Sequence, residues 1–248
     1  NYYGINSLGT HSNNNLISNN TCENDNYSIW LFSSNNNLIS NNNISCSNTI
    51  VENNSDGIVL QFSTNNRIEN NTVGNNFGGV YLYSSSYNNL TNNSCDNNWE
   101  GIYLESSSDN NTLTNNTCSN NKYDGIRLDS SDNNRIYHNN IINNTIQAYD
   151  NGSNYWDDGY PSGGNYWSDY AGSDANGDGI GDTPYNIPGD NNQDHHPLMA
   201  PWTPSWVPPS APSGASTPSA QTNWPLIAGI VVTIVVIGIV AAVYIRRR

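Results

Sequence analysis

The sequence predicts an all-β fold, a solenoid of parallel strands with about six coils of 22–23 residues, followed by a disordered linker and one transmembrane helix. Three observations lead to this prediction: a short motif that recurs at nearly constant spacing, an alternating strand between its copies, and an asparagine content that a stacked structure explains. Without the repeat, the low hydrophobicity and abundant Asn, Ser and Gly would suggest disorder.

The recurring motif is an apolar residue and, two positions later, a pair of asparagines, with a second apolar residue two positions beyond that pair. Full copies start at Ile17, Ile39, Ile68, Leu90 and Leu113, and a weaker last copy runs from Ile136 to Ile141. The spacings between copies are 22, 29, 22, 23 and 23 residues. One coil alone cannot bury its apolar residues, but stacked coils can, with neighbouring strands about 4.8 Å apart. The spacing of 29 marks an insertion near residues 45–55, which we expect to form a loop.

A second strand lies between successive copies of the motif. Its copies read SIWLFSS (28–34), GIVLQFS (57–63), GVYLYSS (79–85), GIYLESS (101–107) and GIRLDSS (125–131). Apolar residues alternate with variable ones, which is the period of two expected of a strand with one buried face. We therefore expect Ile102 and Leu104 to point inward and their neighbours to point outward.

The composition is dominated by asparagine, which occupies 50 of the 248 positions. In a stack, identical asparagines fall above one another, and their amides can hydrogen-bond from coil to coil. The chain carries a net charge of −14 at pH 7, and three of its seven basic residues are its last three. Such an acidic surface excludes nucleic acid as a partner, because phosphate binding needs cations, and it fits cation binding or solubility.

The chain resembles the NosD-like right-handed parallel β-helix proteins that are common on archaeal surfaces. The resemblance covers roughly residues 4–199, and its most specific part is GGNYWSDYAGSDANGDGIGDTPYNI with the later DHHPLM. It implies a right-handed β-helix over residues 1–150 that is closed by a capping module at residues 151–200. It also implies an association with copper-site maturation, and β-helices similar to this one often bind or cleave polysaccharides.

Four cysteines are present, and three of them share one repeat position. Cys22, Cys95 and Cys118 stand where other coils carry Ile or Val, so we expect buried thiols that act as small hydrophobes. A disulfide between Cys95 and Cys118, one coil apart, is the alternative, although the ladder spacing is wide for it. Cys46 falls in the insertion, and the absence of a CxxC motif argues against zinc.

The outward residues of the alternating strand stack into columns. One column reads Trp30, Val59, Tyr81, Tyr103 and Arg127; another reads Phe32, Gln61, Tyr83, Glu105 and Asp129; a third, just before the strand's glycine, holds Asp56, Glu100 and Asp124. The predicted ligand-binding residues are the aromatic ones, a platform suited to sugar rings: Trp30, Phe32, Tyr81, Tyr83 and Tyr103. The other interpretation is that aromatic residues simply favour strands and stack well across them.

Glu105 and Asp129 are candidate catalytic residues, with Arg127 beside them. Adjacent coils place the two carboxyl groups roughly 5 Å apart, the separation found in retaining glycosidases. Any acidic column in a solenoid has that spacing, and Arg127 could simply neutralise the pair. The sequence therefore assigns no catalytic residue and keeps a polysaccharide hydrolase or lyase as the alternative function.

The segment SDANGDGIGDTP (173–184) is a candidate calcium loop. Its oxygen ligands at relative positions 1, 3, 5, 7 and 9 would be Asp174, Asn176, Asp178, the carbonyl of Ile180, and Asp182. Position 12 is Tyr185 and not the bidentate glutamate, so a complete EF-hand is excluded. Calcium is the predicted cofactor, with a structural role where the solenoid must be closed; a solvated turn rich in Asp and Gly is the other interpretation.

Copper is the second metal to consider, through His195, His196 and Met199. Imidazole and thioether are suitable copper ligands. Neighbouring histidines, however, often face apart, and the related module commonly has other residues at this pair. A copper-handling accessory protein is therefore a second alternative function.

The C-terminal part predicts a membrane anchor. Residues 201–224 are rich in Pro and Ser, which is typical of an extended linker. Residues 225–245 are the predicted transmembrane helix, whose 20 residues from 226 to 245 carry no charge and span about 30 Å as a helix. The basic residues 246–248 should stay in the cytoplasm, which places the β-helix outside.

These features favour a single-pass, cell-surface module that binds carbohydrate or has a structural role in the cell envelope. Because the chain starts with Asn inside a repeat, we expect an export signal upstream of it. Several Asn-x-Ser/Thr sequons predict a glycoprotein: Asn26, Asn43, Asn89, Asn110 and Asn143. The expected partners are the membrane and a polysaccharide or other envelope glycan.

Overall fold

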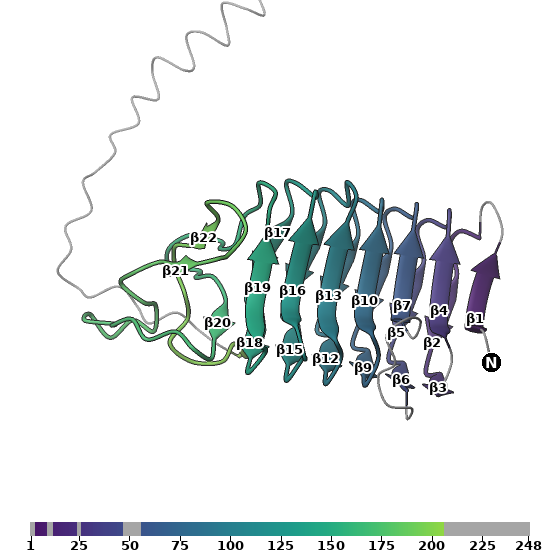
Figure 1. Cartoon of the computed structure of the whole chain (residues 1–248), viewed down its shortest axis with the longest axis horizontal. Helices are drawn as coiled ribbons and strands as arrows, with labels where there is room; N and C mark the ends of the chain where they lie inside the picture. The colour runs from purple at the N-terminus through teal and green to yellow at the C-terminus, as the bar shows by residue number, and fades with distance from the viewer. Residues whose placement is uncertain (1–2, 9–11, 24–25, 47–55, 206–248) are drawn as a thin grey trace, which may run out of the picture. The chain divides into compact units, whose positions relative to one another are not determined.

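The computed structural model describes residues 3–8, 12–23, 26–46 and 56–205, which belong to one compact unit, Asn1–Pro209. In this unit parallel strands stack coil upon coil in the order of the sequence (Figure 1). The predicted all-β solenoid of about six turns is thus confirmed. The described ranges contain no α-helix.

Each coil contributes one strand to each of three parallel sheets. Sheet A holds the long strands β1 (Tyr3–Leu8), β4 (Tyr27–Phe32), β7 (Asp56–Gln61), β10 (Gly78–Tyr83), β13 (Glu100–Glu105), β16 (Asp124–Asp129) and β19 (Ile146–Asp150). Sheet B holds β2 (Leu16–Ser18), β5 (Leu38–Ser40), β8 (Arg67–Glu69), β11 (Asn89–Thr91), β14 (Thr112–Thr114) and β17 (Arg135–Tyr137). Sheet C holds β3 (Thr21–Glu23), β6 (Asn43–Ser45), β9 (Thr72–Gly74), β12 (Ser94–Asp96), β15 (Thr117–Ser119), β18 (Asn140–Ile142) and β20 (Tyr166–Trp167).

The core is a set of apolar ladders inside the coils. Ile102 and Leu104 of β13 are fully buried, as the alternation predicts, and each pairs with an identical residue in β16. Sheets B and C each contribute one inward residue per coil, such as Leu113 and Cys118. Gly101 also faces inward, since an added Cβ would lie 2.4 Å from the carbonyl oxygen of Gly125 and 3.3 Å from the Cβ of Cys118. This close approach explains the glycine that precedes Ile in the strand motif.

The two asparagines of each pair have different roles. The first adopts the left-handed conformation that turns the chain between strands, for example Asn115 with φ of 60°. The second is buried and joins coils: the Oδ1 of Asn116 accepts hydrogen bonds from the backbone N–H of Asn93 (3.0 Å) and from its Nδ2 (2.9 Å). The Nδ2 of Asn116 in turn donates to the Oδ1 of Asn139, in the next coil, at 3.0 Å. The predicted asparagine ladders are confirmed, and the turning role adds a second reason for the pair.

The cysteines that share a repeat position are buried. Cys95 and Cys118 pair in register in sheet C, and both are free thiols with no exposed surface. A hydrogen bond with Cys95 and then burial raise the pKa of the Cys118 thiol. The prediction of buried thiols is confirmed, and Cys22 and Cys46 are buried as well.

Residues 151–205 cover the last coil and carry the short antiparallel pair β21 (Tyr185–Asn186) and β22 (Gln193–Asp194) (Figure 1). Two asparagine ladders end here on carboxylates. The Oδ2 of Asp194 accepts hydrogen bonds from the backbone N–H of Asn165 (2.7 Å) and from the indole N–H of Trp167 (2.9 Å). Asp150 likewise accepts the indole N–H of Trp156 at 2.7 Å. The two buried tryptophans thus cover the end of the apolar core.

Several predictions concern parts of the chain that the structure does not describe. Most of the predicted insertion loop, residues 47–55, lies outside the described residues, as do the linker from residue 206 onward, the predicted transmembrane helix and the basic tail. Among the residues that are described, no helix has the length and apolarity needed to cross a membrane. The anchor therefore stays a prediction.

Candidate functional site

The strand register of sheet A aligns the outward residues in ladders. Trp30 pairs with Val59, Val59 with Tyr81, and Tyr81 with Tyr103, and the ladder continues through Arg127 to Tyr149. The neighbouring ladder runs Phe32, Gln61, Tyr83, Glu105 and Asp129. These are the columns expected from the alternation, because parallel pairing keeps equal positions of successive coils side by side.

The aromatic members of these ladders contact one another. The ring centroids of Tyr81 and Tyr103 are 5.1 Å apart at an angle of 21°, while Trp30 and Phe32 meet edge to face at 6.1 Å. Phe62, whose φ is 52°, lies between Phe32 and Tyr83 and contacts both edge to face. Its ring centroid is 5.6 Å from that of Phe32 and 5.7 Å from that of Tyr83. The predicted ligand-binding residues are therefore brought together on one partly exposed surface.

A hollow of about 240 Å³ interrupts this surface at the β7 coil. Its lining is formed by Tyr27, Trp30, Asp56, Val59, Gln61, Tyr81 and Tyr83. Val59 is the small member of its ladder, and it leaves space between the larger side chains of Trp30 and Tyr81. The sequence placed Val59 in the column, but it did not reveal the hollow or the participation of Tyr27.

Carboxyl groups form a third ladder, in which Glu100 and Asp124 are buried and Asp56 is half-buried. Asp56 pairs with Tyr27, Glu100 with Gly78, and Asp124 with Ile146, so the acids follow one register position of sheet A.

The environment of each acid differs. Burial raises the pKa of Asp56 to about 6, although the backbone N–H of Gly78 donates to its Oδ1 at 3.0 Å. Burial also raises the pKa of Glu100 to about 7, with Arg127 partly offsetting it. Asp124 has no exposed surface, and its Oδ1 has no hydrogen-bond partner. Burial raises its pKa too, against the hydrogen bond from Arg127.

Aromatic residues also precede this acid ladder, which the sequence analysis missed. Phe77 and Trp99 stack at 6.1 Å and 9°, and Trp99 and Tyr123 at 6.3 Å and 23°. Each of the three stands directly before the residue that occupies the acid position in its coil. In each of these coils, the residue just before the acid position belongs to this stacked ladder, and the residue three positions after it belongs to the ladder of Tyr81. The signal was an aromatic residue at the same place in three consecutive coils.

The candidate catalytic residues are all engaged by neighbouring side chains. Arg127 donates to Asp124 (3.0 Å) and to Asp129 (3.3 Å), and its guanidinium lies 4.5 Å from the ring centroid of Tyr149. The Tyr81 hydroxyl donates a short hydrogen bond to Glu105. A hydrogen bond from Asn151, followed by those from Arg127, lowers the pKa of Asp129.

The loop at residues 173–184 is organised around its carboxylates. The Oδ1 of Asp174 accepts the backbone N–H of Gly177 at 2.8 Å, and the Oδ2 of Asp182 accepts that of Ala175 at 2.8 Å. Asp178 is buried and its Oδ1 accepts the N–H of Ile180. The ring of local hydrogen bonds brings Asp174, Asn176 and Asp178 close together. The calcium prediction itself stays a prediction.

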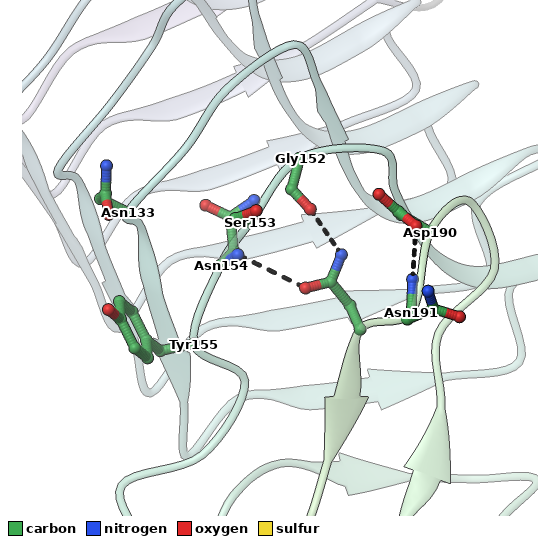
Figure 2. A pocket seen from close by; sticks show the side chains of 8 residues that line it. Asn133, Gly152, Ser153, Asn154, Tyr155, Asp190 and Asn191 are labelled. Carbon is green, nitrogen blue, oxygen red and sulfur yellow. Dashed lines mark hydrogen bonds between the residues drawn. The ribbon is translucent and has the colours of Figure 1, made fainter.

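A polar hollow of about 290 Å³ lies in the cap, beside the last coil (Figure 2). The Asn192 amide donates to the carbonyl of Gly152 at 2.7 Å, and its oxygen accepts the Asn154 N–H at 3.4 Å. Tyr155 stands at the edge and is 61% exposed. The sequence contained no signal for this hollow, since its walls come from segments 40 residues apart.

A family model described as "Periplasmic copper-binding protein (NosD)" matches residues 1–172. The chain belongs to the NosD family. The family predicted from the repeats and the cap is therefore confirmed. The curated proteins offer no match to this NosD-family chain.

One similar solved structure is a double mutant of the periplasmic alginate epimerase AlgG. The identity is 23% and the TM-score is 0.39, and the match covers 54% of this chain and 35% of that one. This NosD-family chain thus spans about a third of the length of that enzyme. A likeness at this level carries no argument about function.

The family description names copper, so the predicted copper ligands require a test of fit. The Nδ1 atoms of His195 and His196 both contact the Asp157 carboxylate, at 3.3 and 3.1 Å. Burial of Asp157 is outweighed by hydrogen bonds from these two residues, and the pKa of its carboxyl is lowered. In the described part of the chain no group of three or more His, Cys, Asp or Glu side chains could hold a metal ion. Copper binding at His195, His196 and Met199, whose thioether is not among the side chains of such a group, stays a prediction.

Proposed function

We propose that this NosD-family chain is a carbohydrate-binding module of the cell envelope, whose ligand lies on the outer face of sheet A. The observation that supports the proposal best is the hollow beside Asp56, which combines four aromatic side chains with a carboxyl and an amide group. Apolar and aromatic walls with a few placed polar groups are typical of small-molecule sites. Aromatic faces suit the C–H surfaces of sugar rings, and carboxyl and amide groups suit their hydroxyls.

The binding surface extends beyond the hollow. Tyr103 stacks on Tyr81, and the stacked ladder of Phe77, Trp99 and Tyr123 runs through the same coils. With coils about 4.8 Å apart, such ladders offer a surface that continues over several sugar units of a polymer. A repeated surface favours a polysaccharide as the ligand over a single small molecule.

Binding without cleavage is favoured by the state of the acids. Glu105 accepts the Tyr81 hydroxyl, and Asp129 is paired with Arg127, so neither is presented towards the hollow. A polysaccharide hydrolase or lyase that uses Glu105, Asp129 and Arg127 is the alternative. It requires these contacts to break when substrate binds.

The remaining parts of the proposal concern stability and location. Calcium in the 173–184 loop would stabilise the cap, because Asp178 is buried there and Ile180 pairs with Leu198, which also pairs with Tyr166 of β20. The apolar segment 226–245 would anchor the module at the cell surface, with the described unit outside. Four of the five sequon asparagines have exposed side chains, at Asn43, Asn89, Asn110 and Asn143, which is compatible with glycosylation.

A glycan screen tests the proposed function. The 248-residue chain, kept in detergent micelles, is titrated with soluble polysaccharides while released sugar is followed. We expect binding without release, and a Tyr81→Ala variant to bind at least about tenfold more weakly. Tyr87→Asn is the matched control, because Tyr87 is exposed, lies outside the hollow and has φ of 60°, which asparagine tolerates. Absence of binding to any glycan contradicts the proposal, and released sugar favours the enzyme.

A further inference from the structure

We propose that the hollow beside Asp56 selects a glycan that carries free amino groups, with an ammonium group of an amino sugar seated against Asp56. This inference rests on the proposed carbohydrate-binding function and adds the chemical class of the ligand. It is drawn from the ring of aromatic side chains, the carboxyl group among them and the charge of the surrounding face.

The aromatic side chains surround a position suited to a cation. Tyr27 and Trp30 meet at 5.5 Å and 31°, and they line one part of the hollow. Tyr81 and Tyr83 meet at 6.4 Å and line another part. The faces of such rings attract ammonium groups, most strongly where water is excluded, and cages of several rings bind organic ammonium ligands in this way.

Asp56 supplies a carboxyl group that lacks a cationic partner. Within the described part of the chain, no Lys or Arg forms an ion pair with Asp56. The backbone N–H of Gly78 donates a hydrogen bond to one of its two oxygens, and within the described ranges no other side-chain hydrogen bond of Asp56 is formed. Burial without a cation is what raises the pKa of this carboxyl to about 6. An ammonium group at the other oxygen would supply the missing charge.

The excess of carboxyl groups on the outer face of sheet A favours cationic sugars over anionic ones. Among the described residues, the outward and preceding positions of the sheet A strands β7 to β16 carry five carboxyl groups and one guanidinium, Arg127. The five are Asp56, Glu100, Glu105, Asp124 and Asp129. Arg127 is already paired with two of them. Among the described residues that line the hollow, a uronic acid would meet the carboxyl of Asp56 and no basic side chain, while an amino sugar would meet complementary charge.

The second buried acid fits the same ligand. Glu100 lies two coils from Asp56 in sheet A and is 8% exposed. Trp99, which stacks on Phe77, stands directly before Glu100 in the chain. A carboxyl group at this register position thus recurs two coils along the stack, as binding of a polymer of amino sugars requires.

The test compares two oligosaccharides that differ in whether their amino groups are free or acetylated. The 248-residue chain in micelles is titrated calorimetrically at pH 7 with the β-1,4-linked tetramer of glucosamine and with its fully N-acetylated form. We expect the glucosamine tetramer to bind roughly tenfold more tightly, since a desolvated cation–π contact and a charge pair are both lost on acetylation. We also expect Asp56→Asn to abolish this preference, so that the two tetramers bind the variant with equal affinity.

Two controls keep the outcome clear. Glu23→Gln removes one negative charge from an exposed position on sheet C and should retain the preference. On the wild-type chain, raising sodium chloride from about 20 mM to about 500 mM should shrink the preference, whatever the stability of the variants.

Three results would overturn the inference. Equal binding of both tetramers, or a preference that survives in Asp56→Asn, contradicts the amino-sugar site but leaves carbohydrate binding intact. Binding of neither tetramer nor of any other glycan contradicts the proposed function together with this inference.

Discussion

Replacing Asn116 by glycine removes one rung of a buried asparagine ladder. The Oδ1 of Asn116 accepts two hydrogen bonds from Asn93, and its Nδ2 donates to Leu90 and to Asn139, at distances of 2.9 to 3.0 Å. At about 1 kcal/mol for each of these four bonds, plus about 1 kcal/mol for glycine inside the coil, the free energy of unfolding falls by roughly 5 kcal/mol. The donors and acceptors left in the core add to this loss.

Asn115→Gly is the matched control, because the neighbouring asparagine has the same side chain and a different role. Its φ of 60° is a conformation that glycine adopts without strain, and its side-chain amide donates a long hydrogen bond of 3.4 Å to Asn92, its one such bond within the described residues. We expect a change below about 1 kcal/mol for Asn115→Gly. Asn115→Ala should cost about 1–2 kcal/mol, since alanine resists the left-handed conformation.

Guanidinium unfolding followed by tryptophan fluorescence measures these differences, provided that the slope of the transition is the same for all variants. The expected order of stability is wild type and Asn115→Gly, then Asn115→Ala, then Asn116→Gly. Similar losses for the two glycine variants, or a loss below about 1 kcal/mol for Asn116→Gly, would refute the assigned roles.

Three further predictions concern the cap and the core. The pKa of Asp194 is raised to about 6, above its unfolded value of 3.8, because burial outweighs its hydrogen bonds from Asn165, Trp167 and His196. Below about pH 4 the carboxyl is protonated in both states and does not lower the free energy of unfolding. As the pH rises to about 6, the unfolded chain ionises before the folded one, and the free energy of unfolding falls progressively. The wild type should thus lose about 3 kcal/mol relative to Asp194→Asn between about pH 4 and pH 7 in chemical unfolding, and parallel pH profiles would contradict this. Calcium should raise the melting temperature by roughly 5 °C, and Asp178→Ala should abolish the shift; identical melting with and without chelator would count against the site. Cys118→Val should change the free energy of unfolding by less than about 1 kcal/mol, because valine already fills that position at Val73; a loss of several kcal/mol would indicate a role beyond packing.

The sequence predicted the ladders because parallel stacking converts a repeat spacing directly into contact. Once Tyr81 and Tyr103 occupy equal positions in successive coils, their pairing follows, and so does that of Glu105 with Asp129. The family was also predictable from the sequence, since the repeats that the family model matches over residues 1–172 are visible as a regular spacing.

The hollow and the ends of the ladders could not be predicted in the same way. The hollow depends on the volume that Val59 leaves unfilled, and a pattern of residue classes carries no information about unfilled volume. Asp194 closes an asparagine ladder 29 residues after Asn165, from a segment with no repeat to fix its register. The left-handed turn at the first asparagine of each pair was missed because the ladder alone already explained the asparagine content.

Oxidative footprinting of the aromatic side chains, with and without a saturating glycan, tests the central claim most directly. Every side chain on the predicted surface reports its own protection, so the measurement shows both whether and where the ligand binds. The account predicts protection of Trp30, Tyr81 and Tyr103, with Tyr87 unchanged. Protection confined to Tyr155 in the cap, or no protection on sheet A while the glycan is bound, would contradict it.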